Sequence, residues 1–171
     1  MVDQLDDVTI RPAGSGDAGT IARIHVASWR EAYAGIVPET YLAAIDEDSR
    51  TSRWAEILSG ADSRTWIAEV DRRTVGFASV GPSRDEDAEP GDQELYSIYL
   101  DPEAWGRGVA RELMRTVLAE LPAGTPLSLW VLADNERAQH FYRRHGFAAD
   151  GVEKLEDLGG ERFTEVRYRR A

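Results

Sequence analysis

The chain has 171 residues, a formal net charge of −11 at pH 7 and no cysteine. Its length is typical of one compact domain, so we expect a single domain over residues 1–171. The absence of cysteine excludes disulfide scaffolds, thiolate zinc sites and cysteine nucleophiles. The negative charge disfavours nucleic acid as a partner, because phosphates would be repelled; it suits cationic ligands, or solubility alone.

Membrane, secreted and metal-dependent proteins are disfavoured as well. No stretch approaches the roughly 18 apolar residues of a membrane span, so we expect no membrane partner. Residues 1–7 are acidic and lack an apolar segment, which predicts no secretory signal and a cytoplasmic protein. The three histidines, His25, His140 and His145, lack the spacing of metal ligands on a helix, so we expect no metal.

The first third of the chain predicts one strand followed by helices. Residues 8–11 form the expected strand, which ends at a proline. Apolar residues then recur at spacings of three and four from Ile21 to Trp29, a pattern typical of an amphipathic helix. Two shorter helical segments follow, around residues 41–45 and 54–58.

The remainder of the chain predicts a sheet with two more helices. The expected strands are apolar segments bounded by turn residues, at residues 66–70, 75–80, 94–100 and 127–132. The expected helices have apolar residues at helical spacing, at residues 109–121 and 135–145. Two last strands are expected around Gly159 and Gly160. This order predicts a mixed α/β (α+β) domain: helices, then a meander, then two strand–helix units.

An acidic loop separates two of these strands. Residues 85–92 contain five acids together with Pro90 and Gly91. Such a composition predicts a solvated hairpin tip rather than a binding segment.

The loop before the helix at 109–121 is the first segment that suggests a function. Small residues at Gly106, Gly108 and Ala110 would allow an anionic group to approach the backbone N–H groups of the first helical turn. Arg107 and Arg111 would add positive charge at the rim. The segment is neither a nucleotide P-loop nor a dinucleotide fingerprint, and glycine before a helix is also common in ordinary turns.

The helix at 135–145 is the second such segment. Ala138, Phe141, Tyr142 and His145 share one face of it. Tyr142 could be a core residue, although its hydroxyl group requires a polar partner at a pocket edge.

Together the two segments resemble those of the GNAT superfamily of acyl-CoA-dependent N-acyltransferases. The loop resembles the family's pyrophosphate loop, although Trp105 stands where the family usually has Gln or Arg. The helix resembles the family's second motif at Asn135, Ala138, Phe141, Tyr142, Gly146 and Phe147.

The resemblance implies a fold and a cofactor site. The fold would be a single GNAT-like domain with a mixed, mostly antiparallel sheet of about seven strands, flanked by helices and splayed in a V between the fourth and fifth strands. Acetyl-CoA would be the co-substrate, with no metal. Its expected contacts are Ile98, Tyr99, Leu100, Trp105, Gly106, Arg107, Gly108, Val109, Ala110, Arg111, Asn135, Ala138 and Tyr142.

The same resemblance suggests catalytic groups. Tyr142 would protonate the leaving thiolate, and a bulge in the strand at 94–100 would free an N–H group of Ile98 or Tyr99 for the thioester oxygen. Glu94 would accept the amine's proton, unless it is an ordinary charge at a strand end. Other possible proton carriers are Tyr96, Ser97 and His25, of which His25 is expected to be structural.

The acceptor is expected to be a primary amine of a small molecule or peptide, attacking directly in a ternary complex. It would lie between the first helices and the last two strands, near Trp29, Tyr33, Glu94 and Tyr96, although these aromatic residues also suit a packed helix face. A non-catalytic acyl-CoA-binding sensor or scaffold is the alternative function. Acetylation of an RNA-bound amine is disfavoured by the negative charge. Either a monomer or a homodimer is expected.

Overall fold

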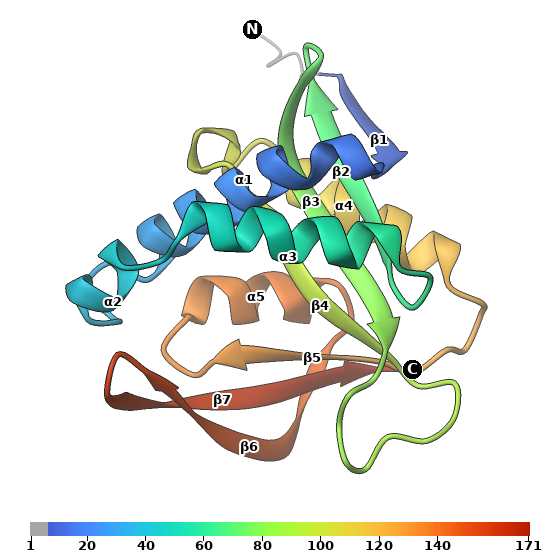
Figure 1. The fold of residues 1–171 in the computed structure, drawn as a ribbon. Helices are drawn as coiled ribbons and strands as arrows, with labels where there is room; N and C mark the ends of the chain where they lie inside the picture. Colours follow the sequence, from blue (N-terminus) through green and yellow to red (C-terminus); the bar gives the residue numbers. More distant parts are fainter. Residues whose placement is uncertain (1–6) are drawn as a thin grey trace, which may run out of the picture.

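Seven strands form one sheet in the computed structural model, which describes residues 7–171 (Figure 1). They are β1 (Val8–Pro12), β2 (Arg64–Val70), β3 (Arg73–Pro82), β4 (Gln93–Leu100), β5 (Leu127–Leu132), β6 (Ala148–Leu158) and β7 (Glu161–Arg170). Their order across the sheet is β1-β2-β3-β4-β5-β7-β6. The expectation about a secretory signal falls mostly on residues 1–6, which lie outside the described part.

Helices cover both faces of this sheet (Figure 1). They are α1 (Ala18–Ala32), α2 (Glu39–Ala43), α3 (Glu47–Ser59), α4 (Val109–Glu120) and α5 (Glu136–Arg144), with short 3₁₀ turns at Ser15–Asp17 and Pro102–Ala104. One core joins α1 and α3 to β2 and β3, where Ile21, Ile67 and Phe77 are fully buried. A second core lies under α4, whose apolar spacing buries Leu113 and Val117 against the opposite face.

The fourth and fifth strands diverge from one another. They are parallel, whereas the other neighbouring strands of the described sheet pair antiparallel. Pairing between β4 and β5 is confined to Gln93 with Leu127 and Glu94 with Ser128, at the beginning of both strands. The predicted mixed sheet and its V-shaped splay are therefore confirmed.

A bulge kinks β4 just beyond the last of these pairs. Ser97 pairs with Ser79 but Leu95 pairs with Val80, so Tyr96 is an extra residue in β4. The Tyr96 ring lies over Gly81, where a Cβ atom would come within 2.6 Å of the ring, so a glycine is required at this position of β3. The bulge thus lies at Tyr96, just before Ile98, where the residues expected to contact the acyl donor begin.

The acidic loop between β3 and β4 is exposed over most of its length, as predicted, but some of its acids also attach it to the sheet. The Trp130 indole Nε1 donates to Asp85 at 2.8 Å, and Arg167 of β7 pairs with Asp85 and Asp87 at 3.2 and 2.6 Å. Only 6% of the Arg167 side chain is exposed, because Asp150 of β6 also holds its Nε at 2.6 Å. Two acids of this solvent-exposed loop are thus partners of a buried cation.

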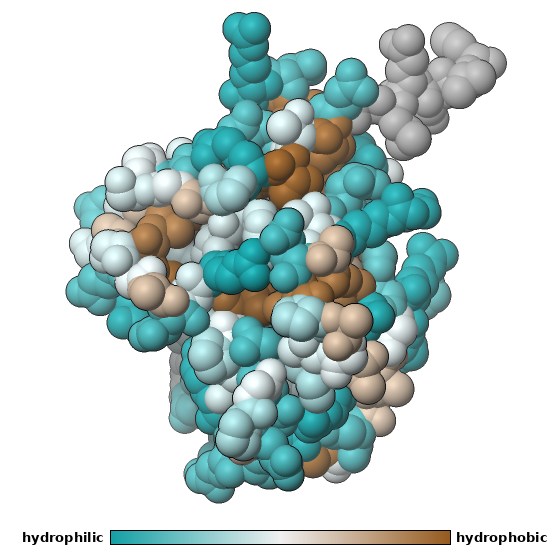
Figure 2. Space-filling view, turned by 90° about the vertical axis from the view of Figure 1, so that its right-hand side faces the viewer, coloured by the Kyte–Doolittle hydropathy of each residue, from teal (hydrophilic) through white to brown (hydrophobic). Residues whose placement is uncertain are grey.

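The surface is mostly polar. Hydrophilic side chains cover most of the face in Figure 2, with apolar residues visible in patches between them. No helix within residues 7–171 is both long and apolar enough to cross a membrane. The same residues contain no cluster of three or more histidine or acidic side chains arranged to hold a metal ion.

Candidate active site

The loop before α4 presents open backbone N–H groups. Gly106 and Gly108 both have φ of +79°, a left-handed conformation that favours glycine, and a Cβ at either position would meet no atom within 4 Å. Gly108 is the N-cap of α4 and has no side chain to cap the first turn. The N–H groups of Val109, Ala110 and Arg111 therefore lack intrahelical acceptors, and the helix dipole makes this open cradle suitable for a pyrophosphate.

Trp105 fixes this loop to two other elements. Its Nε1 donates to the carbonyl oxygen of Leu100 at 3.2 Å, at the end of β4. The guanidinium of Arg137, from the first turn of α5, lies 4.3 Å from the centroid of its ring. The rim also has the exposed side chains of Arg107 and Arg111. Positive charge thus surrounds the cradle although the family's usual polar residue is replaced by tryptophan.

The splay leaves one edge of β4 without a strand partner. Main-chain groups of a strand point alternately to its two neighbours. Beyond Glu94, the described part of β5 no longer pairs with β4, so the groups of Ile98 and its neighbours that point toward β5 are open to another polar chain. The amides of a pantetheine arm suit such an edge.

Tyr142 lies at the open end of the splay. Its helix begins at Asn135, whose Oδ1 accepts the N–H of Ala138 at 3.1 Å. The ring packs edge-on against Phe147, with ring centroids 6.0 Å apart. Burial and the neighbouring Tyr33 raise the pKa of the Tyr142 hydroxyl above its usual value, so Tyr142 is protonated at neutral pH and can act as a proton donor.

Glu94 lies in the narrow end of the splay, and its carboxylate is occupied. Oε1 accepts the backbone N–H of Arg84 at 3.0 Å, and Oε2 accepts Nη2 of the same arginine at 2.8 Å. Only 4% of the Glu94 side chain is exposed, against 68% for Arg84. The predicted proton acceptor is thus held in a closed ion pair with the loop between β3 and β4.

Tyr96 and Ser97, the two neighbours of Glu94 expected to relay a proton, differ in their surroundings. The Tyr96 hydroxyl donates to the carbonyl oxygen of Pro82, and the Arg84 guanidinium lies 4.2 Å from the centroid of its ring. Burial raises the pKa of Tyr96. The Ser97 hydroxyl is buried and has no hydrogen-bond partner in the described structure. Tyr96 is therefore engaged by its own hairpin, whereas Ser97 has a polar atom with an unused bonding capacity.

Trp29 and Tyr33 lie together where α1 ends, across the splay from α5. Their ring centroids are 4.5 Å apart. Asn135 Nδ2 donates to the Tyr33 hydroxyl at 3.4 Å, and burial raises the pKa of Tyr33. The end of α1 therefore contacts the beginning of α5. Tyr33 also adds to the raised pKa values of Tyr142 and Tyr99, whose main cause is burial.

His25 is a core residue, as expected. Its ring stacks on Tyr99, with centroids 5.1 Å apart, and its Nδ1 accepts from Trp54 Nε1 at 3.4 Å. Burial, helped by Arg50, lowers the pKa of His25 to about 4. The ring is neutral at physiological pH. It packs with the core formed by α1, α3, β2 and β3 rather than in the splay.

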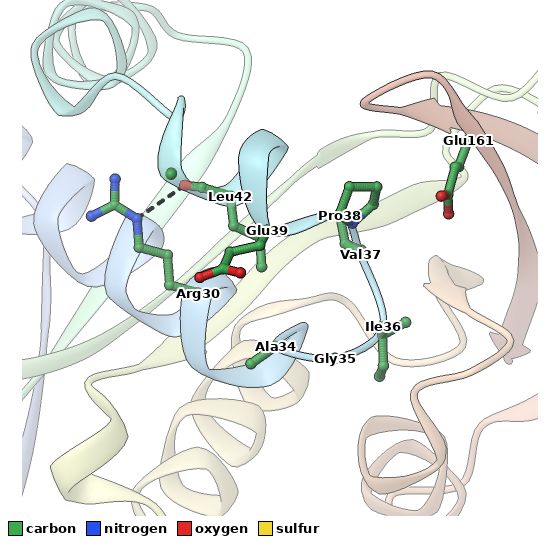
Figure 3. A pocket seen from close by; sticks show the side chains of 10 residues that line it. Arg30, Ala34, Gly35, Ile36, Val37, Pro38, Glu39, Leu42 and Glu161 are labelled. Carbon is green, nitrogen blue, oxygen red and sulfur yellow. Dashed lines mark hydrogen bonds between the residues drawn. The ribbon is translucent and has the colours of Figure 1, made fainter.

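A cavity of about 750 Å³ lies beside the expected acceptor region (Figure 3). The end of α1, the segment through α2 and Glu161 at the start of β7 line it. Glu39 and Glu161 are acidic residues in its lining, and Arg30 is fixed there by donating to the carbonyl oxygen of Leu42 at 3.0 Å. The sequence placed the acceptor between the first helices and the last two strands, and this cavity lies in that region.

The family model described as the acetyltransferase (GNAT) family matches residues 23–147, which include the cradle, the splay and Tyr142. The chain belongs to the GNAT family. It is 38% identical over 165 residues to the uncharacterized N-acetyltransferase YuaI of Bacillus subtilis, covering 93% of this chain and 90% of YuaI. It is therefore an acyltransferase of the GNAT type.

Two further proteins are similar to this chain. The PaiA N-acetyltransferase of Thermoplasma acidophilum, solved in complex with coenzyme A, superposes with a TM-score of 0.69 at 23% identity, covering 94% of this chain and 98% of PaiA. The peptidyl-lysine N-acetyltransferase YjaB of Escherichia coli is 30% identical over 95 residues, covering 55% of this chain and 56% of YjaB. In the present protein, the cradle and the open edge of β4 fit the binding of an acyl-CoA.

The structure brings most of the expected GNAT residues to one splay. The cradle lies at the start of α4, the open edge at Ile98 and its neighbours, and Tyr142 at the other wall. Arg137, Arg84 and Glu165 were not singled out from the sequence. Arg137 lies within the second motif and could have been found there; the other two become informative only when strand register is known.

Proposed function

We propose that this GNAT enzyme transfers an acetyl group from acetyl-CoA to the primary amine of a small molecule or peptide, by direct attack in a ternary complex. The observation that supports it most is the position of a protonated tyrosine, Tyr142, at one wall of the splay, while the strand at the other wall, β4, leads into an anion cradle. Acetyl-CoA supplies an activated thioester when bound. A module that only bound acyl-CoA would require the cradle but no proton donor.

The residues of the chain divide the work of the reaction. The N–H groups at the start of α4 bind the pyrophosphate, and the open edge of β4 orients the pantetheine arm. A backbone N–H beyond the bulge, at Ile98 or Tyr99, stabilises the oxygen that becomes negative, which is an oxyanion-hole role. Tyr142 donates its proton to the departing thiolate and is protonated again from solvent.

The acceptor is expected to be cationic before it reacts. The net charge of −11 attracts ammonium groups, and aromatic rings and carboxylates lie at the acceptor side of the splay. The name of YjaB, a peptidyl-lysine N-acetyltransferase, supports a lysine side chain within a peptide as one such acceptor.

Ligand-induced stabilisation tests the donor half of this function. A ligand that binds the native state raises the unfolding temperature by mass action, so acetyl-CoA and free CoA should both stabilise the protein, while NADPH should not. The absence of any shift with CoA species far above micromolar concentration would contradict the cofactor assignment.

Thiol release tests the acceptor half. Three probes represent different amines: an N-terminally blocked lysine peptide, a lysine-free peptide with a free N-terminus, and spermidine. Release of CoA that depends on one of them, with the matching gain of an acetyl group by mass spectrometry, supports the function. Stabilisation by acetyl-CoA without turnover of any probe would favour the non-catalytic module.

A further inference from the structure

Glu94 is poorly arranged to accept a proton from substrate. Both of its oxygen atoms already accept hydrogen bonds from Arg84, at 3.0 and 2.8 Å. Each oxygen of the carboxylate is therefore already paired with a donor of the β3–β4 loop. With 4% of its side chain exposed, Glu94 also offers little surface to an incoming amine. The bonding of Glu94 suits a residue that holds the β3–β4 loop in place.

A second carboxylate, Glu165, lies at the open end of the splay. In the sheet, Glu165 of β7 is paired in register with Leu132, the last residue of β5. The neighbouring Thr164 accepts the N–H of Ala133 at 2.8 Å, at the point where the chain leaves β5 toward α5. Glu165 therefore lies beside the connection that positions Asn135 and the helix of Tyr142.

The groups around Glu165 come from three elements. Lys154 of β6 is its ion-pair partner, with Nζ 3.8 Å from Oε2, a longer contact than those at Glu94. The other titratable groups that interact with it are Glu156 of β6, Glu94 and Tyr99 of β4, and Tyr33 of α1. It therefore faces the same space as the aromatic residues expected to bind the acceptor. Its side chain is 19% exposed, so a substrate can reach it.

The electrostatic surroundings of Glu165 suit a base. Burial is the main cause that raises its pKa, and the negative charges of Glu156 and Glu94 add to the effect, while Lys154 opposes it. A carboxylate with a raised pKa accepts a proton more readily near neutral pH than an ordinary one.

We propose that Glu165, and not Glu94, is the residue that accepts the proton of the substrate ammonium group. The inference rests on the proposed function and names a catalytic residue within it. Glu165 takes one proton from the ammonium and later releases it to solvent. The neutral amine forms the new C–N bond with the thioester carbon and the C–S bond breaks. The amine's second proton passes to solvent as the amide forms. The thiolate takes a proton from Tyr142, which solvent then protonates again, so the products are an N-acetyl amide, CoA and one released proton.

Lys154 tunes this base in the structure. Its Nζ lies 4.1 Å from the centroid of the Trp130 ring as well as 3.8 Å from Glu165. Removal of its charge should raise the pKa of Glu165 further. Removal of the charge of Glu156 should lower it, because that carboxylate repels the ionised form. Two single substitutions on β6 thus shift one titration in opposite directions.

The test is the pH dependence of kcat/KM with acetyl-CoA and the fastest of the three amine probes. Glu165→Gln should lower kcat/KM at pH 7 by roughly 10²- to 10⁴-fold and remove the acidic limb of the profile. Lys154→Met should move that limb to higher pH and Glu156→Gln to lower pH, whereas Glu94→Gln should retain it. The unfolding temperature and its increase with acetyl-CoA should be unchanged in Glu165→Gln, because the substitution is nearly isosteric and lies away from the cradle.

Three results would overturn the assignment, and they are distinguishable from one another. If Glu165→Gln retains the acidic limb and stays within threefold of the wild type, Glu165 is not the base although the proposed function stands. If Glu94→Gln removes the limb instead, the base is Glu94. If the wild type is stabilised by acetyl-CoA but turns over none of the probes, the proposed function fails and the assignment of Glu165 fails with it.

Discussion

The guanidinium of Arg137 lies 4.3 Å from the centroid of the Trp105 ring, so that α5 is joined to the loop before α4. Trp105 is joined to β4 in turn, because its Nε1 donates to the carbonyl oxygen of Leu100 at 3.2 Å. The three elements proposed to surround the acyl donor thus meet at one indole. The tryptophan replaces a polar residue that is usual in the GNAT loop, and Arg137 brings a cation to the same rim from another helix.

Arg137→Leu should therefore weaken acetyl-CoA binding about three- to tenfold, which is about 0.7–1.4 kcal/mol. The loss should be smaller at high salt, because exposed charge interactions are screened. Arg144→Leu is the matched control: Arg144 is exposed and lies in the last turn of the same helix. Calorimetric titration at two salt concentrations measures the acetyl-CoA affinity of both variants. Equal affinities would show that Arg137 does not contribute to the binding site.

Gly108→Ala should lower acetyl-CoA affinity at least tenfold, because the new methyl group would occupy the open side of the cradle. Gly124→Ala is an unusually close control, since Gly124 has φ of +78° and also no atom within 4 Å of an added Cβ. Both variants carry the same left-handed strain, about 1–2 kcal/mol, but Gly124 lies between α4 and β5. Equal loss of stability with unequal loss of affinity supports the cradle; unchanged affinity in Gly108→Ala contradicts it.

Tyr142→Phe should lower kcat by roughly 10²- to 10⁴-fold while the dissociation constant of CoA stays within about twofold, because only a proton donor is removed. Tyr168→Phe is the control. The Tyr168 hydroxyl accepts from Arg143 and donates to Gln139, both at 2.9 Å, so its loss should reduce stability by about 1 kcal/mol and leave kcat unchanged. Rapid single-turnover measurements separate the two effects. Weakened CoA binding equal to the loss in kcat would make Tyr142 a packing residue.

Local patterns in the sequence predicted the elements well. The spacing of apolar residues in α1 and α4 and the glycines around the cradle act over a few residues, so their consequences are visible in one segment. The splay between β4 and β5 was expected through the GNAT resemblance, because no local pattern shows that two strands will pair at only two positions.

Long-range partners explain what the sequence did not predict. Arg167 holds Asp85 from a position 82 residues away, so the attachment of the exposed acidic loop to the sheet was not visible in the local sequence. Glu94 was a reasonable base until its neighbour Arg84 was seen to occupy both oxygens. Glu165 is one charged residue in an alternating strand, and only the register of β7 with β5 places it at the splay.

The buried His25 gives the fold a pH dependence whose sign can be stated. Its pKa is about 4 in the folded protein, against about 6.5 in an unfolded chain. Between these values the unfolded chain binds a proton that the folded chain does not. The free energy of unfolding should therefore fall as pH decreases from 6.5 toward 4, by about 2–3 kcal/mol in total.

Urea unfolding between pH 7.5 and 4.5 measures this dependence. In His25→Phe, which keeps an aromatic ring against Tyr99, most of the decrease should disappear even if the variant is less stable at pH 7.5. His140→Gln should retain the wild-type dependence, because His140 is exposed. His145 contributes with the same sign, since burial lowers its pKa too, so a residual slope is expected in His25→Phe. A slope in His25→Phe equal to that of the wild type would mean that His25 is protonated in the folded state, and its stacking on Tyr99 would then have to accommodate a charge.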